Sequence, residues 1–247
     1  MSRSASGAQQ HDAEPSRRGL TIEVGTDPHT RAAVKIDLGR HPHILAFGGT
    51  GSGMTSTMAL ISAHAARVGC EVTLLDADYG ANFEYFNRVR AIKVVTNVDA
   101  MAAAIVDFHT DVVAHRDAGT YAAAPQVMVI DGLHRLSRMA REDTHLAGVL
   151  RLLHDVLHHG GGTGHHLVAD ISQLAPSAVP VSALRERAST VVLPQPQRLL
   201  LDRADIDPLL LHAHPHTGVV REPGGTAHAV ILSHAKPAEL YELAAGR

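Results

Sequence analysis

The chain has 247 residues, enough for one substantial core, and α/β units of this length often form a single domain. Its formal net charge of −3 and pI near 6.7 do not by themselves indicate a nucleic-acid or anionic-membrane partner. The single cysteine, Cys70, excludes an internal disulfide, and no apolar run is long enough for a transmembrane helix. We therefore expect a soluble, cytoplasmic protein with no membrane segment of its own.

The amino-terminal part of the chain predicts a tail followed by a hairpin. Residues 1–19 are rich in Ser, Gln, Ala and Arg, so we expect a disordered tail there and one folded domain over residues 20–247. β-Rich runs over residues 20–24 and 32–38 flank the turn sequence GTDPHT and predict two paired strands. The apolar run HILAFG then predicts a buried strand, followed by a glycine-rich loop and a helix over about residues 53–67.

Short apolar runs alternate with helical patterns through the rest of the chain. They predict strands over residues 71–78, 91–96, 126–132, 165–172 and 189–194, and helices over residues 99–118, 144–160 and 182–188. We expect the glycine cluster at residues 160–164 to end the second of these helices. Two strands around the turn PGG and a short helix close the chain. This alternation is typical of an α/β fold, a mostly parallel sheet with helices on both faces and a C-terminal β-hairpin.

Nineteen histidines raise the question of a metal site. His212, His214 and His216 alternate in the sequence HAHPH, and an extended backbone would place the three imidazoles on one face. The proline between them and the loop context argue against a rigid site, and no Cys or acidic fourth ligand is close by. The pairs at residues 158–159 and 165–166 flank the glycine cluster, and we interpret them as solvated turn residues.

The sequence HILAFGGTGSGMTS carries the spacing of a phosphate-binding loop, G-x-x-x-x-G-K-[ST]. Thr55 stands where the motif's hydroxyl ligates Mg²⁺, but Met54 occupies the position of the phosphate-gripping lysine. A strand, a glycine loop and a helix direct backbone amides and the positive end of the helix dipole at one anion. By spacing alone, a plain strand-to-helix turn is an equal alternative. The candidate nucleotide-binding residues are Gly48, Gly49, Thr50, Gly51, Ser52, Gly53, Met54, Thr55 and Ser56.

Two further polar residues follow predicted buried strands. Asp131 ends the run QVMVID, where P-loop proteins place the aspartate of the Mg²⁺ shell, so Thr55 and Asp131 are the candidate metal ligands. Gln173 lies just past the run HHLVADIS, where a polar group can contact a γ-phosphate. Gly132 stands where a water-activating glutamate usually follows the aspartate. Without bound Mg²⁺, Asp131 is an ordinary strand-end carboxylate.

These motifs resemble the FtsK/SpoIIIE-type motor domain of DNA translocases, which has relatives in conjugative transfer and type VII secretion ATPases. The stretch VKIDLGRHPHILAFGGTGSGMTS is similar to the family's leading strand and AGxTGSGKS loop, and VIDGL to its VDE strand. GTGHHLVADISQ is similar to the family's GIHLILATQRP segment, which places Gln173 on its sensor glutamine. The resemblance covers roughly residues 20–235 and implies a RecA-like P-loop NTPase fold, with ATP and Mg²⁺ as cofactors and a homo-oligomeric assembly.

Two departures from the family pattern bear on hydrolysis. A charge-assisted hydrogen bond is worth about 1.5–3 kcal/mol, so Met54 in place of lysine should weaken nucleotide binding by roughly one to two decades. General-base assistance is worth about 10²–10⁴ in rate, and Gly132 removes it. We therefore expect a degraded ATPase site in which Asp131 and Gln173 are the remaining catalytic candidates from the same chain.

The sequence leaves three functions open. The first is a nucleotide-binding domain of a DNA or protein translocation system with a degraded ATPase site. The second is an active ATP-dependent translocase of double-stranded DNA in plasmid transfer, a mobile element or chromosome partition. The third is a non-catalytic scaffolding or regulatory subunit, in a motor ring mixed with a competent paralogue or in a type VII secretion complex. Arg116 resembles a family arginine near a neighbouring subunit, and is either a catalytic finger acting in trans or a surface arginine at a helix end.

Overall fold

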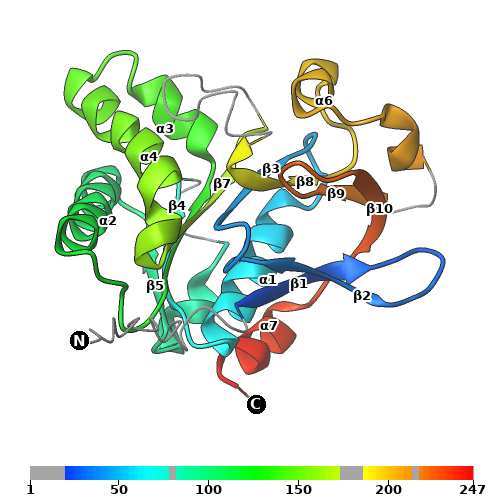
Figure 1. Cartoon of the computed structure of the whole chain (residues 1–247), viewed down its shortest axis with the longest axis horizontal. Coiled ribbons are helices and arrows are strands. Elements are labelled where there is room, and N and C mark those ends of the chain that lie inside the picture. Colours follow the sequence, from blue (N-terminus) through cyan, green and yellow to red (C-terminus); the bar gives the residue numbers. More distant parts are fainter. Residues whose placement is uncertain (1–19, 78–81, 173–185, 213–216, 247) are drawn as a thin grey trace, which may run out of the picture.

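A ten-stranded sheet runs through the described chain, which comprises residues 20–77, 82–172, 186–212 and 217–246 of a computed structural model (Figure 1). The strand order is β2-β1-β10-β9-β8-β3-β7-β6-β4-β5. The six strands from β8 to β5 are parallel, and the other four extend the sheet as antiparallel strands. The strands are β1 Thr21–Thr26, β2 Ala33–Asp37, β3 His43–Phe47, β4 Glu71–Asp76, β5 Ile92–Val95, β6 Gln126–Asp131, β7 His165–Asp170, β8 Ala188–Val192, β9 Thr217–Arg221 and β10 Ala227–Leu232.

Helices cover both faces of this sheet, as the alternating sequence pattern predicts. Side chains alternate in direction along a strand, so Leu45 and Phe47 of β3 pack in the core beneath α2 and α4, whereas Ile44 packs in the opposite core with α1 and α7. Figure 1 shows α2, α3 and α4 on one side of the sheet and α1 and α7 on the other. The helices are α1 Met54–Arg67, α2 Val98–Ala118, α3 Leu133–Met139, α4 Thr144–Thr163, α6 Arg198–Ala204 and α7 Pro237–Ala244.

The predicted α/β class, the mostly parallel sheet and both hairpins are confirmed. β1 pairs with β2, and β9 pairs with β10, around the two turns identified in the sequence. Helix α2 begins after Asn97, whose side-chain oxygen accepts hydrogen bonds from the amides of Asp99 and Ala100. The short helices α3 and α6 were not expected, because each is only seven residues long. Residues 182–185 of the predicted helix over residues 182–188 lie outside the described residues, and Ala188 is already the first residue of β8.

The glycine cluster does end the long helix, but the predicted position of that end, Gly160, is wrong. Helix α4 continues through the cluster to Thr163, and only Gly164, with φ of 82°, turns the chain out of the helix. A Cβ on Gly160 would lie 2.6 Å from the carbonyl oxygen of His165, and one on Gly161 would lie 2.6 Å from Pro42. These two glycines therefore let the helix end pack closely against neighbouring chain segments, a tertiary constraint that outweighs their low helix propensity.

The interpretation of His165 and His166 as solvated turn residues is also wrong, although His158 and His159 are exposed. Both strand histidines are fully buried at the start of β7. His165 Nε2 lies 2.8 Å from a carboxylate oxygen of Asp111 on α2, and His166 Nδ1 donates to the carbonyl oxygen of Pro42 over 2.9 Å. These partners are distant in sequence, so local composition gives no sign of them.

A buried histidine on β3 makes the fold sensitive to acid. His43 is fully buried, and its Nδ1 accepts a hydrogen bond from the amide of Leu167 on β7. Burial lowers the pKa of His43 to about 3, and the neighbouring His166 acts in the same direction. Burial likewise lowers the pKa of His166 to about 4. Both imidazoles are therefore neutral in the folded protein, and protonation favours the unfolded chain.

We predict that His43→Asn reduces the acid sensitivity of folding, because the amide oxygen keeps the Leu167 bond and removes the titrating ring. The pKa of His43 is lower in the folded than in the unfolded chain, so its contribution to stability is intact above about pH 6.5 and is lost as the pH falls towards 3. Between pH 7 and pH 5 the free energy of unfolding of the wild type should fall by about 2 kcal/mol more than that of His43→Asn. Urea unfolding at several pH values measures this. Exposed His145→Asn is the control, and equal pH slopes for wild type and His43→Asn would contradict the prediction.

Candidate functional site

The loop between β3 and α1 is held by both strands that flank β3. The amide of Gly48 donates to Ser172 Oγ just past β7, over 3.2 Å, and the amide of Gly49 donates to the carbonyl oxygen of Pro194 just past β8, over 2.9 Å. Gly51 and Gly53 have positive φ angles of 75° and 90°, a region where side chains are strained. No side chain caps α1, so its first-turn amides remain available to a ligand.

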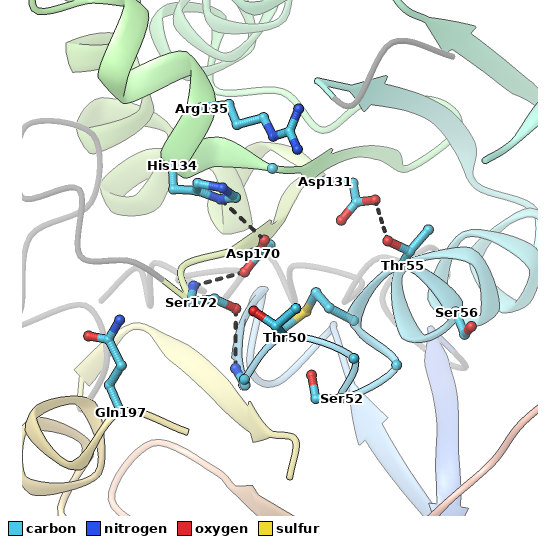
Figure 2. Close-up of a pocket in the computed structure, with 16 residues that line it drawn as sticks. Thr50, Ser52, Thr55, Ser56, Asp131, His134, Arg135, Asp170, Ser172 and Gln197 are labelled. Carbon is cyan, nitrogen blue, oxygen red and sulfur yellow. Dashed lines mark hydrogen bonds and ion pairs between the residues drawn. The ribbon is translucent and has the colours of Figure 1, made fainter. Parts of the chain in front are cut away.

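A cavity of about 680 Å³ lies over this loop, at the carboxyl edge of the parallel strands (Figure 2). Ligands of open α/β sheets bind outside this edge, because the loops that follow the parallel strands meet there. The structure brings all the predicted loop residues and Asp131 together around the cavity. The lining residues are Gly48, Gly49, Thr50, Gly51, Ser52, Gly53, Met54, Thr55, Ser56, Asp131, Gly132, His134, Arg135, Asp170, Ser172 and Gln197.

The hydroxyl of Thr55 and the carboxylate of Asp131 meet on one wall of this cavity (Figure 2). Thr55 Oγ1 donates to Asp131 Oδ2 over 3.0 Å, although the two residues are 76 positions apart. Asp131 ends β6 and is 3% exposed. Two hard oxygen donors from different elements therefore point to the same place, which is the donor set that Mg²⁺ prefers.

A second carboxylate, that of Asp170, also lines the cavity and was not recognised in the sequence. It ends β7, which lies between β3 and β6 in the sheet. Asp170 Oδ1 accepts a hydrogen bond from the amide of Ser172 over 2.8 Å, and Oδ2 lies 3.8 Å from His134 Nδ1. Its position at the carboxyl end of a buried strand was the available signal, because such ends converge at one edge of a parallel sheet.

The cavity carries little positive charge for a phosphate site. Met54, at the lysine position, is half-buried and packs against the core around α1. Among the lining residues that the structure describes, Arg135 is the only arginine or lysine. It lies in the first turn of α3, four residues after Asp131, so the sequence motif does not identify it.

The backbone at Gly132 explains why a glutamate is absent there. Gly132 is the N-cap of α3 and has φ of 81° and ψ of 33°, in the left-handed region. A residue with a Cβ is strained in this conformation, so the turn that starts α3 favours glycine. A glutamate at this position would therefore be strained by the local path of the chain.

Of the other two catalytic candidates, the structure places only Arg116, which does not line the cavity. Gln173 lies outside the described residues. Arg116 lies near the end of α2, where its Nε is 3.0 Å from Asp117 and its Nη1 is 3.6 Å from Asp155. Because α2 connects the parallel strands β5 and β6, it ends at the amino edge of the sheet, opposite the cavity. Arg116 therefore cannot reach the cavity of its own chain.

The hypothesis of a histidine metal site, against which the sequence argues, is not tested by the structure, because His214 and His216 are outside the described residues. Within the described part of the chain, no three His, Cys, Asp or Glu side chains are grouped closely enough to hold a metal ion. That finding is compatible with Mg²⁺ at Thr55 and Asp131, since Mg²⁺ is commonly held by one or two carboxylates, water and substrate phosphates. Among the described helices, none combines the length and hydropathy needed to cross a bilayer.

The chain matches no protein-family model and no curated protein sequence. Among solved structures, it is similar to the pCW3 conjugation coupling protein TcpA in its monomer form with ATPγS, with a TM-score of 0.69 and 18% identity over 93% of this chain and 71% of TcpA. The chain is also similar to the cytoplasmic domain of the type VII secretion ATPase EccC of Thermomonospora curvata, with a TM-score of 0.68 and 16% identity over 89% of this chain. A third similar structure is VirB4 of Thermoanaerobacter pseudethanolicus, with a TM-score of 0.62 and 10% identity over 90% of this chain and 98% of VirB4.

These neighbours are FtsK/HerA-type ATPases, so the chain has the RecA-like P-loop fold that the sequence motifs predict. At identities of 10–18% the likeness concerns the fold. The chain spans only 27% of the EccC structure. The suspected resemblance to an FtsK/SpoIIIE-like motor domain is confirmed at that level.

We predict that Gly49→Ala disturbs the loop. A Cβ there would lie 2.4 Å from the carbonyl oxygen of Gln195, a backbone atom that cannot easily move, so the variant should lose about 1–3 kcal/mol of stability. For a domain of this size that corresponds to a fall in Tm of roughly 2–12 °C. Gly162→Ala is the matched control, because its Cβ would meet nothing within 4 Å and its Tm should not fall. An unchanged Tm for Gly49→Ala would show that the loop is looser than its contacts indicate.

Proposed function

We propose that the chain is a nucleotide-binding P-loop domain of a DNA or protein translocation system, with a degraded ATPase site. The observation that carries the proposal is the 3.0 Å contact between Thr55 and Asp131 beside the glycine loop. A plain strand-to-helix turn requires neither this pairing nor a cavity of about 680 Å³ above it. The fold shared with translocation ATPases supports the same reading.

The nucleotide we propose is ATP, with its phosphates over the loop that contains Thr50 and Ser52 and over the first turn of α1, which contains Ser56. The uncapped amides of α1 and the loop amides would hold the phosphate oxygens. Thr55 and Asp131 would hold Mg²⁺, which when bound neutralises charge on the β- and γ-phosphates. Their oxygen atoms are already paired in the protein, so the site fits a hard cation without rearrangement of the backbone.

Weakened turnover follows from the charge and chemistry of the cavity. Met54 supplies no charge-assisted hydrogen bond, and Gly132 supplies no proton acceptor. Arg135 offers the cavity a permanent positive charge, which we propose partly offsets the missing lysine. The expected result is retained binding at reduced affinity, with hydrolysis well below a motor's rate.

We further propose that residues 20–247 act as one cytoplasmic domain within an oligomer. We propose assembly with other copies or with a competent paralogue, since TcpA is named as a conjugation coupling protein and EccC as a type VII secretion ATPase. Arg116 lies at the edge of the sheet opposite the cavity of its own chain, so any catalytic role for it requires the cavity of a neighbouring subunit. Double-stranded DNA is the cargo to test first, because the sequence resemblance is to DNA translocases.

We predict that Met54→Lys tightens Mg²⁺-ATP binding by about 10- to 100-fold, because it restores one charge-assisted hydrogen bond to phosphate. Isothermal titration calorimetry of wild type and variant measures the two Kd values. Met139→Lys is the matched control, because Met139 is exposed on α3 and does not line the cavity. Absence of ATP binding by both wild type and Met54→Lys would refute the nucleotide-binding proposal.

The Mg²⁺ assignment generates a separate prediction for Thr55→Ala. The variant should lose about 10-fold or more in affinity for ATP when Mg²⁺ is present, because it removes an oxygen ligand. In EDTA, wild type and variant should bind ATP equally. Thr110→Ala, which removes an exposed threonine hydroxyl on α2, should leave both values unchanged. An equal loss of ATP affinity with Mg²⁺ and in EDTA would instead show that Thr55 contacts the phosphates directly and does not bind Mg²⁺.

A further inference from the structure

A histidine and a carboxylate form a second polar pair in the cavity, separate from the Thr55 and Asp131 pair (Figure 2). His134 comes from the first turn of α3, and Asp170 comes from the carboxyl end of β7. In the sheet β7 lies between β3, which leads into the loop, and β6, which ends at Asp131. The pair therefore lies at the same edge of the sheet as the glycine loop and Asp131.

Asp170 is held in a fixed orientation by the chain around it. It is 4% exposed, and its Oδ1 accepts the amide hydrogen of Ser172 over 2.8 Å. The hydroxyl of Ser172 in turn accepts the amide hydrogen of Gly48 over 3.2 Å, which connects the carboxylate to the loop. In many catalytic sites, a buried carboxylate with one oxygen facing a histidine ring nitrogen fixes the orientation of the imidazole.

His134 combines this partner with access to the cavity. Its side chain is 20% exposed, and its Nδ1 is buried, makes no hydrogen bond and faces Asp170 Oδ2 at 3.8 Å. A proton on Nδ1 leaves Nε2 as the basic nitrogen of the ring. The 3.8 Å separation is too long for a hydrogen bond, and such contacts in catalytic sites often shorten only when substrate binds.

The other lining residues leave few groups able to accept a proton. Asp131 is paired with Thr55, and Gly132 has no side chain. Arg135 carries donors only, and serine and threonine hydroxyls are weak bases at neutral pH. Of the described lining residues, this leaves His134, backed by Asp170, as the candidate for the role that a glutamate has in the family.

We propose that His134 is the general base of a slow nucleoside triphosphatase reaction in this cavity, and that Asp170 positions it. Water attacks the γ-phosphorus, an O–P bond forms, and the bond from that phosphorus to the β,γ-bridging oxygen breaks to release the diphosphate. His134 Nε2 takes the proton from the attacking water, and Asp170 stabilises the resulting imidazolium. The proton then passes to solvent. The inference rests on the proposed nucleotide-binding function and adds a base to it.

Single-turnover hydrolysis of ATP at saturating protein, together with separately measured ATP affinity, tests the assignment. We expect His134→Ala to lower the rate constant by about 10²-fold or more while Kd stays within about twofold. Added imidazole should restore part of the rate in His134→Ala. Asp170→Asn should keep the Ser172 bond through its amide oxygen and lower the rate less than His134→Ala does. His145→Gln, an exposed histidine outside the cavity, is the control.

The outcomes separate this inference from the proposed function. A rate lost in His134→Ala and restored by imidazole, with binding unchanged, supports both. ATP binding without measurable hydrolysis by wild type, or wild-type hydrolysis by His134→Ala, overturns the general base and leaves the nucleotide-binding proposal intact. Absence of ATP binding by wild type removes the proposed function itself. Circular dichroism melting of each variant distinguishes loss of chemistry from loss of fold.

Discussion

The structure depends on the way in which the loop after β3 is held between its two neighbouring strands. Gly48 bonds to the segment after β7, and Gly49 bonds to the segment after β8. Because all three strands are parallel, their following segments reach the same edge of the sheet and can hold the loop from both sides. The position of α1, and with it that of Thr55 opposite Asp131, follows from this anchoring.

The lining residues that differ from the phosphate-binding motif lie close to other charged and polar side chains of the cavity. Met54 removes one positive charge near the loop, while Arg135 brings another from α3. Gly132 has no carboxylate side chain, and glycine allows the left-handed turn that begins α3. That same helix then carries His134 towards Asp170. Gly132 is therefore a chain neighbour of His134 and Arg135, because all three lie at the start of α3.

Several features were readable from local sequence because the physics that produces them is local. The apolar run of β3 predicts a strand buried on both faces, and the start of α2 depends on Asn97, which accepts hydrogen bonds from amides two and three residues ahead. The spacing of Gly48, Gly53 and Thr55 identified the loop, and the carboxylate after a buried run identified Asp131. His165 and His166 were misjudged, because their partners Asp111 and Pro42 are contributed by distant segments.

The sequence by itself determined the α/β class, the position of the loop and the two departures from the motif, because periodicity and spacing are properties of neighbouring residues. Only the tertiary structure decided that α4 runs through its glycines, since close packing against His165 and Pro42 favours residues without a Cβ. It also decided that Asp170, His134 and Arg135 share a cavity with the loop. Their convergence depends on the order of β3, β7 and β6 in the sheet, and strand order is set by long-range pairing that no local pattern specifies.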